Sequence, residues 1–302
     1  MISVFFVVDG PKLETQAHFL AASILQHMAG RCRFYAYVRP GTELPETLMR
    51  LFEKAGIALR SIPAPEGRDW RKPYPIGNKL LAAADEREGE IAVFLDTDVV
   101  FCGPVDFEAA LGDATVAAVL SDFLTSAVPT AQDWEPLYAQ MGVPMPLERP
   151  GTLRRPNLDY PPYFNAGVVL FRERTQDGNI HVGREWLDMT LDLDHQVAFA
   201  AQRDNLDQIT LSALGARCGT PTKILPQRYN YNIMGWGDPE PGSCDIAHYH
   251  LIGRLWKSPT VGTPTLRALH EHMGAEDLAR FVDRSRAFLR WRRAKQLLRQ
   301  VG

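Results

Sequence analysis

Short apolar runs alternate with amphipathic segments along the first third of the chain. The strand-like runs are residues 2–8, 33–38, 57–63 and 91–101. The segments with apolar positions at helical spacing are residues 12–29, 43–56 and 78–88. Strands that alternate with helices form parallel βαβ units. The pattern therefore predicts an α/β fold with a mostly parallel central sheet flanked by helices.

The pattern changes in the middle of the chain. Residues 122–163 hold eight prolines and show little periodicity. A loop of this length in a compact domain usually has a function or is disordered. After it, residues 164–172 predict a further strand, while 184–193 and 205–216 predict helices. The chain is expected to end in a helix.

The apolar run at residues 91–101 contains two carboxylates. Asp96 and Asp98 lie two positions apart, so in a strand both would face one side while Thr97 points away. Burying an ionised carboxylate without a partner is costly, and a divalent cation would supply the missing charge. The alternative is that Asp96 caps a turn and Asp98 is solvated.

Two histidines near residue 250 offer further cation ligands. His248 and His250 also have strand spacing, and Gly253, Arg254 and Lys257 follow them. Imidazole in a mixed site favours Mn²⁺ over Mg²⁺, and glycine permits close backbone approach. The two basic side chains can neutralise phosphates. A buried structural histidine with a surface lysine is the alternative interpretation.

Two short polar motifs supply candidate sugar contacts. Asn165 and Gly167 stand at the start of a predicted strand, where an amide can bond sugar hydroxyls. Asp207 and Gln208 stand at the start of a predicted helix. Both pairs are also ordinary at turns or helix starts, so neither motif decides a function alone.

Several widespread catalytic motifs are absent from the sequence. It contains no G-x-x-x-x-G-K-[ST] phosphate loop, no G-x-G-x-x-G after the first strand and no G-x-S-x-G elbow. These absences argue against P-loop nucleotide hydrolysis, dinucleotide-dependent redox chemistry and serine hydrolysis.

The cysteine content and the hydropathy of the chain indicate the compartment in which the protein works. The four cysteines are scattered, and no apolar run approaches the ~20 residues of a membrane helix, so we expect reduced thiols and a cytoplasmic protein.

Residues 280–299 carry eight Lys or Arg against one acid, although the net charge of the chain is −3. Such a helix suits peripheral contact with the anionic inner face of a membrane. A packed terminal helix with a solvated basic face is the alternative, and the acidic remainder argues against nucleic-acid binding.

Taken in order, these motifs resemble those of the nucleotide-sugar-dependent glycosyltransferases with the GT-A fold, most closely the retaining family 8 type. The order is an acid after the first strand, then Asp-Thr-Asp, Asn-Ala-Gly, Asp-Gln, and finally His with Gly and Lys. The resemblance runs from about residue 2 to residue 257 through short motifs.

The resemblance implies a divalent cation on the donor diphosphate. Asp96 and Asp98 match the D-x-D motif, with Thr97 between them in the donor site. His250 matches the histidine of the family's H-x-x-G stretch, which ends here at Gly253. Mn²⁺ is the implied cofactor and Mg²⁺ the second choice. His248 competes with His250 for the same role.

The resemblance also implies contacts to the rest of the nucleotide. Asp9 matches the acidic residue at the nucleotide base, and Lys79 occupies the place of a basic residue near the donor. The family usually places a lysine three residues after its glycine, in Lys-Pro-Trp. Here Lys257 is four residues on and follows Trp256, which is a departure from the family pattern.

Sugar contacts are implied at two further motifs. Asn165, Ala166 and Gly167 match the sugar-binding Asn-Ala-Gly. Asp207 and Gln208 match the pair that faces the transferred sugar and are the implied catalytic residues, although the Ile-Thr-Leu that follows them is altered.

The implied protein is an enzyme that transfers a sugar from a UDP-sugar, with retention, to an unidentified glycan, lipid or protein. We expect a GT-A catalytic domain over residues 1–270, with a nucleotide-binding half (1–110) and a sugar and acceptor half (111–270). A basic amphipathic helix (271–302) would follow, and residues 122–163 would shape the acceptor site. The alternatives are a sugar-1-phosphate nucleotidyltransferase, whose Gly-rich basic loop is missing here, and a non-catalytic transferase-like protein that binds a carbohydrate or a nucleotide sugar.

Overall fold

The structure is a computed structural model that describes residues 1–65 and 67–285. Its strands are β1 (Ile2–Val7), β2 (Arg33–Val38), β3 (Ile57–Ser61), β4 (Ile91–Leu95), β5 (Val99–Phe101), β6 (Val116–Leu120), β7 (Phe164–Arg172), β8 (Lys223–Leu225), β9 (Tyr231–Asn232) and β10 (Ile246–His248). Its α-helices are α1 (Pro11–His27), α2 (Glu46–Ala55), α3 (Asn78–Ala83), α4 (Phe107–Leu111), α5 (Glu135–Gln140), α6 (Val182–His195), α7 (Leu206–Arg217), α8 (Ile233–Trp236), α9 (Ile252–Leu255) and α10 (Pro259–Arg284).

The strands form two sheets. Hydrogen bonds order seven strands as β3-β2-β1-β4-β7-β6-β8, and three more as β5-β10-β9. Within the larger sheet, β2 runs parallel to β3 and β6 parallel to β8, while β7 runs antiparallel to β6. The predicted α/β fold with a mostly parallel sheet flanked by helices is confirmed.

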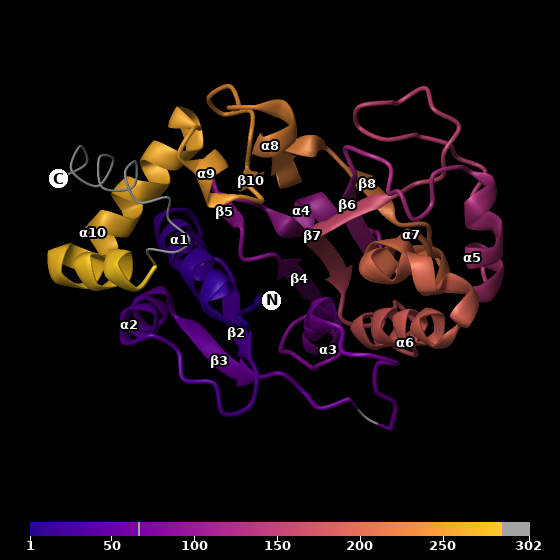
Figure 1. Cartoon of the computed structure of the whole chain (residues 1–302), viewed down its shortest axis with the longest axis horizontal. Helices are drawn as coiled ribbons and strands as arrows, with labels where there is room; N and C mark the ends of the chain where they lie inside the picture. Colours follow the sequence, from indigo (N-terminus) through magenta and orange to yellow (C-terminus); the bar gives the residue numbers. More distant parts are fainter. Residues whose placement is uncertain (66, 286–302) are drawn as a thin grey trace. The chain divides into compact units, whose positions relative to one another are not determined.

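Contacts divide the chain into two units. The first comprises Met1–Ser3, Ile62–Phe94 and Asp106–Gln227. All five residues of β6 are buried, as their apolar sequence predicts. In this unit α6 packs against both α3 and α7, as Figure 1 shows. This packing holds α3, whose second residue is Lys79, beside the N-terminal turn of α7, which carries Asp207.

The second unit comprises Val4–Ser61, Leu95–Val105 and the chain from Arg228 onward. Pro11 opens α1, where a missing amide proton costs no helical hydrogen bond. Both α2 and α10 pack against α1, which Figure 1 shows in indigo. Phe19 of α1 makes edge-to-face contacts with Trp256 and Phe281 at centroid distances of 5.3 and 5.7 Å. The small β5-β10-β9 sheet belongs wholly to this unit.

The prediction of one strand over residues 91–101 is wrong in its middle. The strand β4 ends at Leu95, residues 96–98 form a turn, and β5 joins the smaller sheet. The amide of Val99 donates to the carbonyl of Asp96 at 3.3 Å and closes this turn. Aspartate is common in such turns because it tolerates their backbone conformations. The two aspartates therefore leave the strand instead of interrupting it.

The basic C-terminal stretch is described only as far as Ser285, because residues 286–302 lie outside the described part of the chain. In the described portion, Phe281 and Val282 are buried, and Arg284 lies 3.6 Å from Glu14. This portion of α10 therefore packs within its unit. Membrane contact through residues 286–302 stays a prediction. Among the described residues, no helix is both long enough and apolar enough to cross a membrane.

Candidate active site

In the second unit, three side chains that could bind a metal ion converge. The Asp98 carboxylate and the rings of His248 and His250 offer ligand atoms that all lie within 4.8 Å of one another. Asp98 comes from the turn after β4, and His248 ends β10. The amide of Tyr249 donates to the Asp98 carbonyl at 3.0 Å and ties the two segments together. Residues far apart in sequence thus form one polar cluster.

His250 is held in an unusual backbone conformation. Its φ of +52° is the only positive value outside glycine among the described residues. Such conformations are sparsely populated and concentrate at functional sites. Burial, with a further contribution from His248, lowers the pKa of His250 to about 4, so its imidazole is neutral and able to bind a cation near pH 7.

His248 is buried and is bonded at both ring nitrogens. Its Nε2 lies 3.1 Å from Asp98 Oδ1, and its Nδ1 lies 3.0 Å from Asn230 Oδ1. The two histidine rings stack with centroids 3.7 Å apart. Burial acts to raise the pKa of Asp98, but the His248 charge and hydrogen bond outweigh it, and the pKa falls to about 2. The Asp98 carboxylate is therefore ionised at any pH near neutrality.

The other residues predicted to bind the cation or the diphosphate lie close in sequence to Asp98 or His250 but differ in burial and contacts. Asp96 is half-buried in the turn and is not one of the three grouped side chains in the described chain. Thr97 is buried, and its hydroxyl donates to Gln16 Oε1 at 3.1 Å. Gly253 lies in α9, and Lys257 is exposed just after it.

Asp9 follows β1 and is paired with a basic residue. The Nε of Arg39 donates to Asp9 Oδ1 at 2.5 Å, and the Asp9 side chain is only 13% exposed. Arg39 comes directly after β2, so the two residues stand after neighbouring strands of one unit. The sequence had marked Asp9 but had given no role to Arg39.

In the first unit, Lys79 and Asp207 form a buried ion pair. Lys79 Nζ lies 2.7 Å from Asp207 Oδ2, and the Asp207 side chain is 2% exposed. Tyr74 donates its hydroxyl to the other carboxylate oxygen at 3.4 Å. Burial, followed by the charge of Asp207, raises the pKa of Tyr74, so its hydroxyl keeps its proton as a donor. The structure thus joins two residues that the sequence marked separately.

The backbone around Asp207 is fixed as well. The indole of Trp186 donates to the Asp207 carbonyl at 3.0 Å. Gln208, the next residue, is half-buried, and its neighbours in α7 on both sides are buried. Arg203 holds the segment before α3, because it donates to the carbonyl of Pro73 at 3.2 Å and lies over the Tyr74 ring.

Asn165 and Gly167 lie at an irregularity of β7. Val119 of β6 pairs with Asn165, but Ala118 pairs with Val169, so the intervening residues bulge out of the ladder. The Asn165 side chain accepts a hydrogen bond from the Gly167 amide at 2.8 Å. Its Nδ2 has no hydrogen-bond partner within residues 1–65 and 67–285. Bulges commonly re-aim side chains beside active sites, and here one presents an amide donor.

The proline-rich segment lines a cavity in the first unit. Asp122, Phe123, Leu124, Thr152, Arg154 and Arg155 enclose a volume of about 430 Å³. Phe123 is 52% exposed, and the Arg154 guanidinium lies 5.2 Å from its ring centroid. An exposed aromatic ring beside a guanidinium is a surface that can stack against a polar ring.

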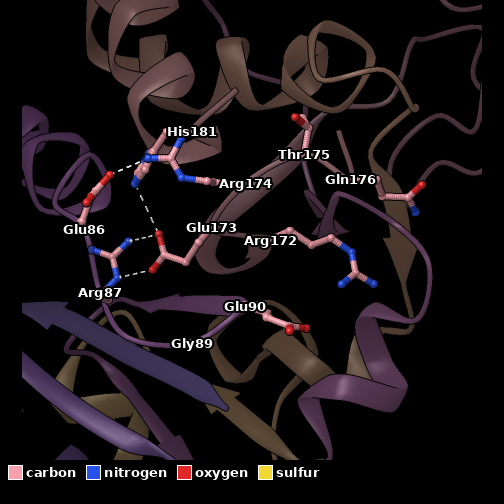
Figure 2. A pocket seen from close by; sticks show the side chains of 10 residues that line it. All are labelled: Glu86, Arg87, Gly89, Glu90, Arg172, Glu173, Arg174, Thr175, Gln176 and His181. Carbon is pink, nitrogen blue, oxygen red and sulfur yellow. Dashed lines mark hydrogen bonds and ion pairs between the residues drawn. The ribbon is translucent and has the colours of Figure 1, made fainter. Parts of the chain in front are cut away.

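A second cavity of about 430 Å³, shown in Figure 2, lies at the far end of β7 from Asn165. There the Arg87 side chain is fully buried and pairs with Glu173 at 2.9 Å. Figure 2 shows His181 pointing at the same carboxylate, with Nε2 at 3.4 Å. Arg87 also donates to the carbonyls of Ala82 and Ala83 at 2.6 and 3.0 Å and so caps α3. These charges serve the placement of α3, and with it Lys79.

Three residues that the sequence motifs do not contain bond residues of the predicted site. Arg39, Tyr74 and Asn230 each bond a residue that the motifs had marked. For Asn230 the signal was the polar "QRYNYN" run between two short apolar runs. For Arg39 and Tyr74 nothing in the local sequence points to the partner, because the contact forms only on folding.

The sequence profile of the Rhodobacterales glycosyltransferase domain matches residues 4–219. This chain belongs to that family. The match covers more than half of the chain and includes the turn with Asp96 and Asp98, the β7 bulge and the Lys79–Asp207 pair. No curated protein matches the sequence.

Solved structures place this glycosyltransferase among GT-A folds. It is similar to the galactosyltransferase LgtC, solved in complex with donor and acceptor sugar analogues, at 14% identity and a TM-score of 0.53, over 92% of this chain and 99% of that one. It is also similar to the bifunctional glycosyltransferase WbbM at 15% identity and a TM-score of 0.58, over 94% of this chain and 51% of WbbM. At such identities the likeness concerns the fold alone. The expected resemblance to GT-A glycosyltransferases of the family 8 type is confirmed.

Proposed function

We propose that this glycosyltransferase moves a sugar from a UDP-sugar to an acceptor, with a divalent cation on the donor diphosphate and with retention at the anomeric carbon. The observation that carries the proposal is the convergence of Asp98, His248 and His250 in one unit of a chain whose family transfers sugars. One carboxylate with two imidazoles is a donor set that suits Mn²⁺ better than Mg²⁺.

The cluster would hold the cation through Asp98 and the two histidines, and Asp96 of the D-x-D motif is a candidate further ligand. When bound, a divalent cation supplies positive charge to the departing diphosphate as a Lewis acid. Arg254 is exposed on α9, and Lys257 is exposed just after it. Both would add positive charge near the departing diphosphate.

Two polar residues are candidates for binding the sugar. Asn165 offers its Nδ2 donor at the β7 bulge, and Asp207 offers a carboxylate that pairs with Lys79 at 2.7 Å. Hydrogen bonds to sugar hydroxyls fix the ring for reaction at the anomeric carbon. Gln208 carries an amide, which is too weak a base to activate an acceptor for in-line displacement. This chemistry and the family 8 resemblance favour retention.

The acceptor would bind beside Phe123, where a sugar or another polar ring can stack. The LgtC structure contains an acceptor sugar analogue, which makes a saccharide acceptor the first to test here.

The proposal is tested by slow release of free sugar from a panel of nucleotide sugars, with and without Mn²⁺. We expect release from a UDP-sugar that requires Mn²⁺ and is lost in Asp98→Ala. The control is Glu43→Ala, which removes an exposed carboxylate outside the cluster. Undiminished release by Asp98→Ala would refute the cation assignment. Binding of a nucleotide sugar with no turnover would favour a non-catalytic role.

A further inference from the structure

We propose that Asn230 is a positioning residue that fixes the His248 imidazole with its Nε2 lone pair directed at the cation site, so that His248 joins His250 as a ligand. The inference rests on the proposed cation at Asp98. It adds a residue that the D-x-D and H-x-x-G motifs do not contain. It also answers the open choice between the two histidines, because both would bind.

Asn230 ends the short 3₁₀ segment Gln227–Asn230 and is 3% exposed. Its Oδ1 lies 3.0 Å from His248 Nδ1, a normal hydrogen-bond distance at which the ring nitrogen donates to the amide oxygen. Its Nδ2 is buried and has no hydrogen-bond partner within the described ranges 1–65 and 67–285. A buried amide donor without a partner is costly, so this amide orientation needs a compensating interaction elsewhere.

The compensation lies on the other side of the His248 ring. Asn230 Oδ1 can only accept, so Nδ1 keeps a proton, while Nε2 faces Asp98 Oδ1 at 3.1 Å. There Nε2 either carries a second proton, which makes the ring a cation bonded to Asp98, or loses that proton and presents a lone pair. A divalent cation at this point would take the place of the second proton and accept both the Nε2 and the Asp98 lone pairs. His250 stacks on the same ring at 3.7 Å and adds a third ligand atom, which favours the cation because a single proton cannot use three ligands.

The opposite amide orientation gives the opposite outcome. If Nδ2 faced the ring, it would donate to Nδ1 and force the proton onto Nε2, where it would point at Asp98 and block a cation. An amide oxygen or a carboxylate behind a histidine is the usual way in which proteins fix a ligand tautomer, and its loss typically weakens metal binding by about 10–100-fold. Asn230 is therefore placed to decide whether His248 can act as a ligand.

The test measures Mn²⁺ binding to the full chain by calorimetry, without donor or acceptor. We expect Asn230→Ala to raise the dissociation constant for Mn²⁺ by about 10–100-fold, which is weaker binding. Asn230→Asp keeps an oxygen behind Nδ1 and should restore the affinity to within about threefold of the natural protein. The control is Thr47→Val, which removes a buried hydroxyl 3.1 Å from the ring of His18, a histidine outside the cluster. It should lower stability and leave Mn²⁺ affinity unchanged.

A second readout follows the tautomer directly. Nitrogen-15 NMR of labelled histidine in the metal-free protein should show His248 protonated at Nδ1, and this signature should be lost in Asn230→Ala. Natural affinity in Asn230→Ala, or equal weakening in Asn230→Asp, would overturn the inference while leaving the cation site intact. No Mn²⁺ binding by the natural chain would overturn the cation site itself, which distinguishes the two failures.

Discussion

Lys79 and Asp207 form an ion pair of 2.7 Å in which both side chains are almost fully buried. Each was marked in the sequence for a separate donor contact, and the structure makes each the partner of the other. A buried carboxylate without a counter-charge is strongly destabilising. The pair is therefore expected to contribute to the stability of the first unit.

We expect Lys79→Met to lower the free energy of unfolding by about 3–5 kcal/mol, because it leaves the buried Asp207 carboxylate without the charge of Lys79. The measurement is urea denaturation, with the double variant Lys79→Met/Asp207→Leu as a cycle that isolates the pair. The double variant should recover part of the loss. The control is Arg174→Met, which breaks an exposed pair with Glu86 in the same unit and should cost at most about 1 kcal/mol. Equal losses of unfolding free energy in Lys79→Met and Arg174→Met would contradict the argument that burial makes the Lys79–Asp207 pair important.

His18 predicts a pH dependence of stability. It is fully buried in α1, where Nδ1 lies 2.8 Å from the Glu14 carbonyl and Nε2 lies 3.1 Å from the Thr47 hydroxyl. Neutral imidazole satisfies both contacts. Burial, the largest cause, lowers the pKa of His18 from 6.5 to about 4. The unfolded chain therefore binds a proton in the window between these values while the folded chain does not.

Stability from this group is fully present above pH 6.5 and is lost as the pH falls toward 4, a change of about 3 kcal/mol. We expect urea denaturation between pH 7 and pH 4 to show this slope, and His18→Gln to show a smaller one. A residual slope should remain in the variant, because burial also lowers the pKa of His250 to about 4. The same slope in both proteins would exclude His18 as its source.

The sequence predicted the parts of the fold that local periodicity determines. The strands β1, β2 and β3 and the helices α1 and α2 follow from apolar spacing, and Gly56 ends α2 in the left-handed conformation that glycine favours. The β5-β10-β9 sheet could not be predicted in this way. Its strands have two or three residues each, too few to show a period, and their pairing joins distant parts of the chain.

The candidate site was predictable as residue types but not as contacts. The motifs marked Asp98 and His250, yet the place of His248 depends on where β10 ends and on the positive φ of His250. Likewise, nothing local in "RDWRKPYP" shows that Tyr74 will donate to Asp207. Such pairings arise from tertiary packing, which a single sequence does not display.

The Arg87–Glu173 pair predicts a remote effect on the site. Arg87 caps the C-terminal end of α3, and Lys79 lies at its N-terminal end. We expect Glu173→Ala to lower the free energy of unfolding by about 3–5 kcal/mol, because it removes the carboxylate that neutralises the buried guanidinium. Hydrogen exchange should show faster opening of residues 78–83 in this variant. Unchanged exchange there would mean that α3 does not depend on the pair.

Gly183 of α6 allows this helix to pack closely against α3. A Cβ at this position would lie 1.9 Å from the Ala83 carbonyl oxygen, so alanine would force α6 and α3 apart. We expect Gly183→Ala to cost about 1–3 kcal/mol of unfolding free energy. Gly103→Ala is the control, since a Cβ there meets no described atom within 4 Å and should change stability by less than about 0.5 kcal/mol. A neutral Gly183→Ala would show that the two helices can separate without loss.

A substitution of Phe123 is expected to change the KM for the acceptor without changing hydrolysis of the donor. Its ring is half-exposed in the cavity of the proline-rich segment, beside Arg154. If the acceptor stacks there, Phe123→Ala should remove about 1 kcal/mol of contact and raise the acceptor KM about fivefold. Release of free sugar from the donor in water should stay unchanged, because no acceptor takes part. Leu147→Ala is the matched control: this side chain is 96% exposed in the same segment. A raised KM in both variants would point to a general disturbance of the loop, and an unchanged KM in Phe123→Ala would remove this cavity from the acceptor site.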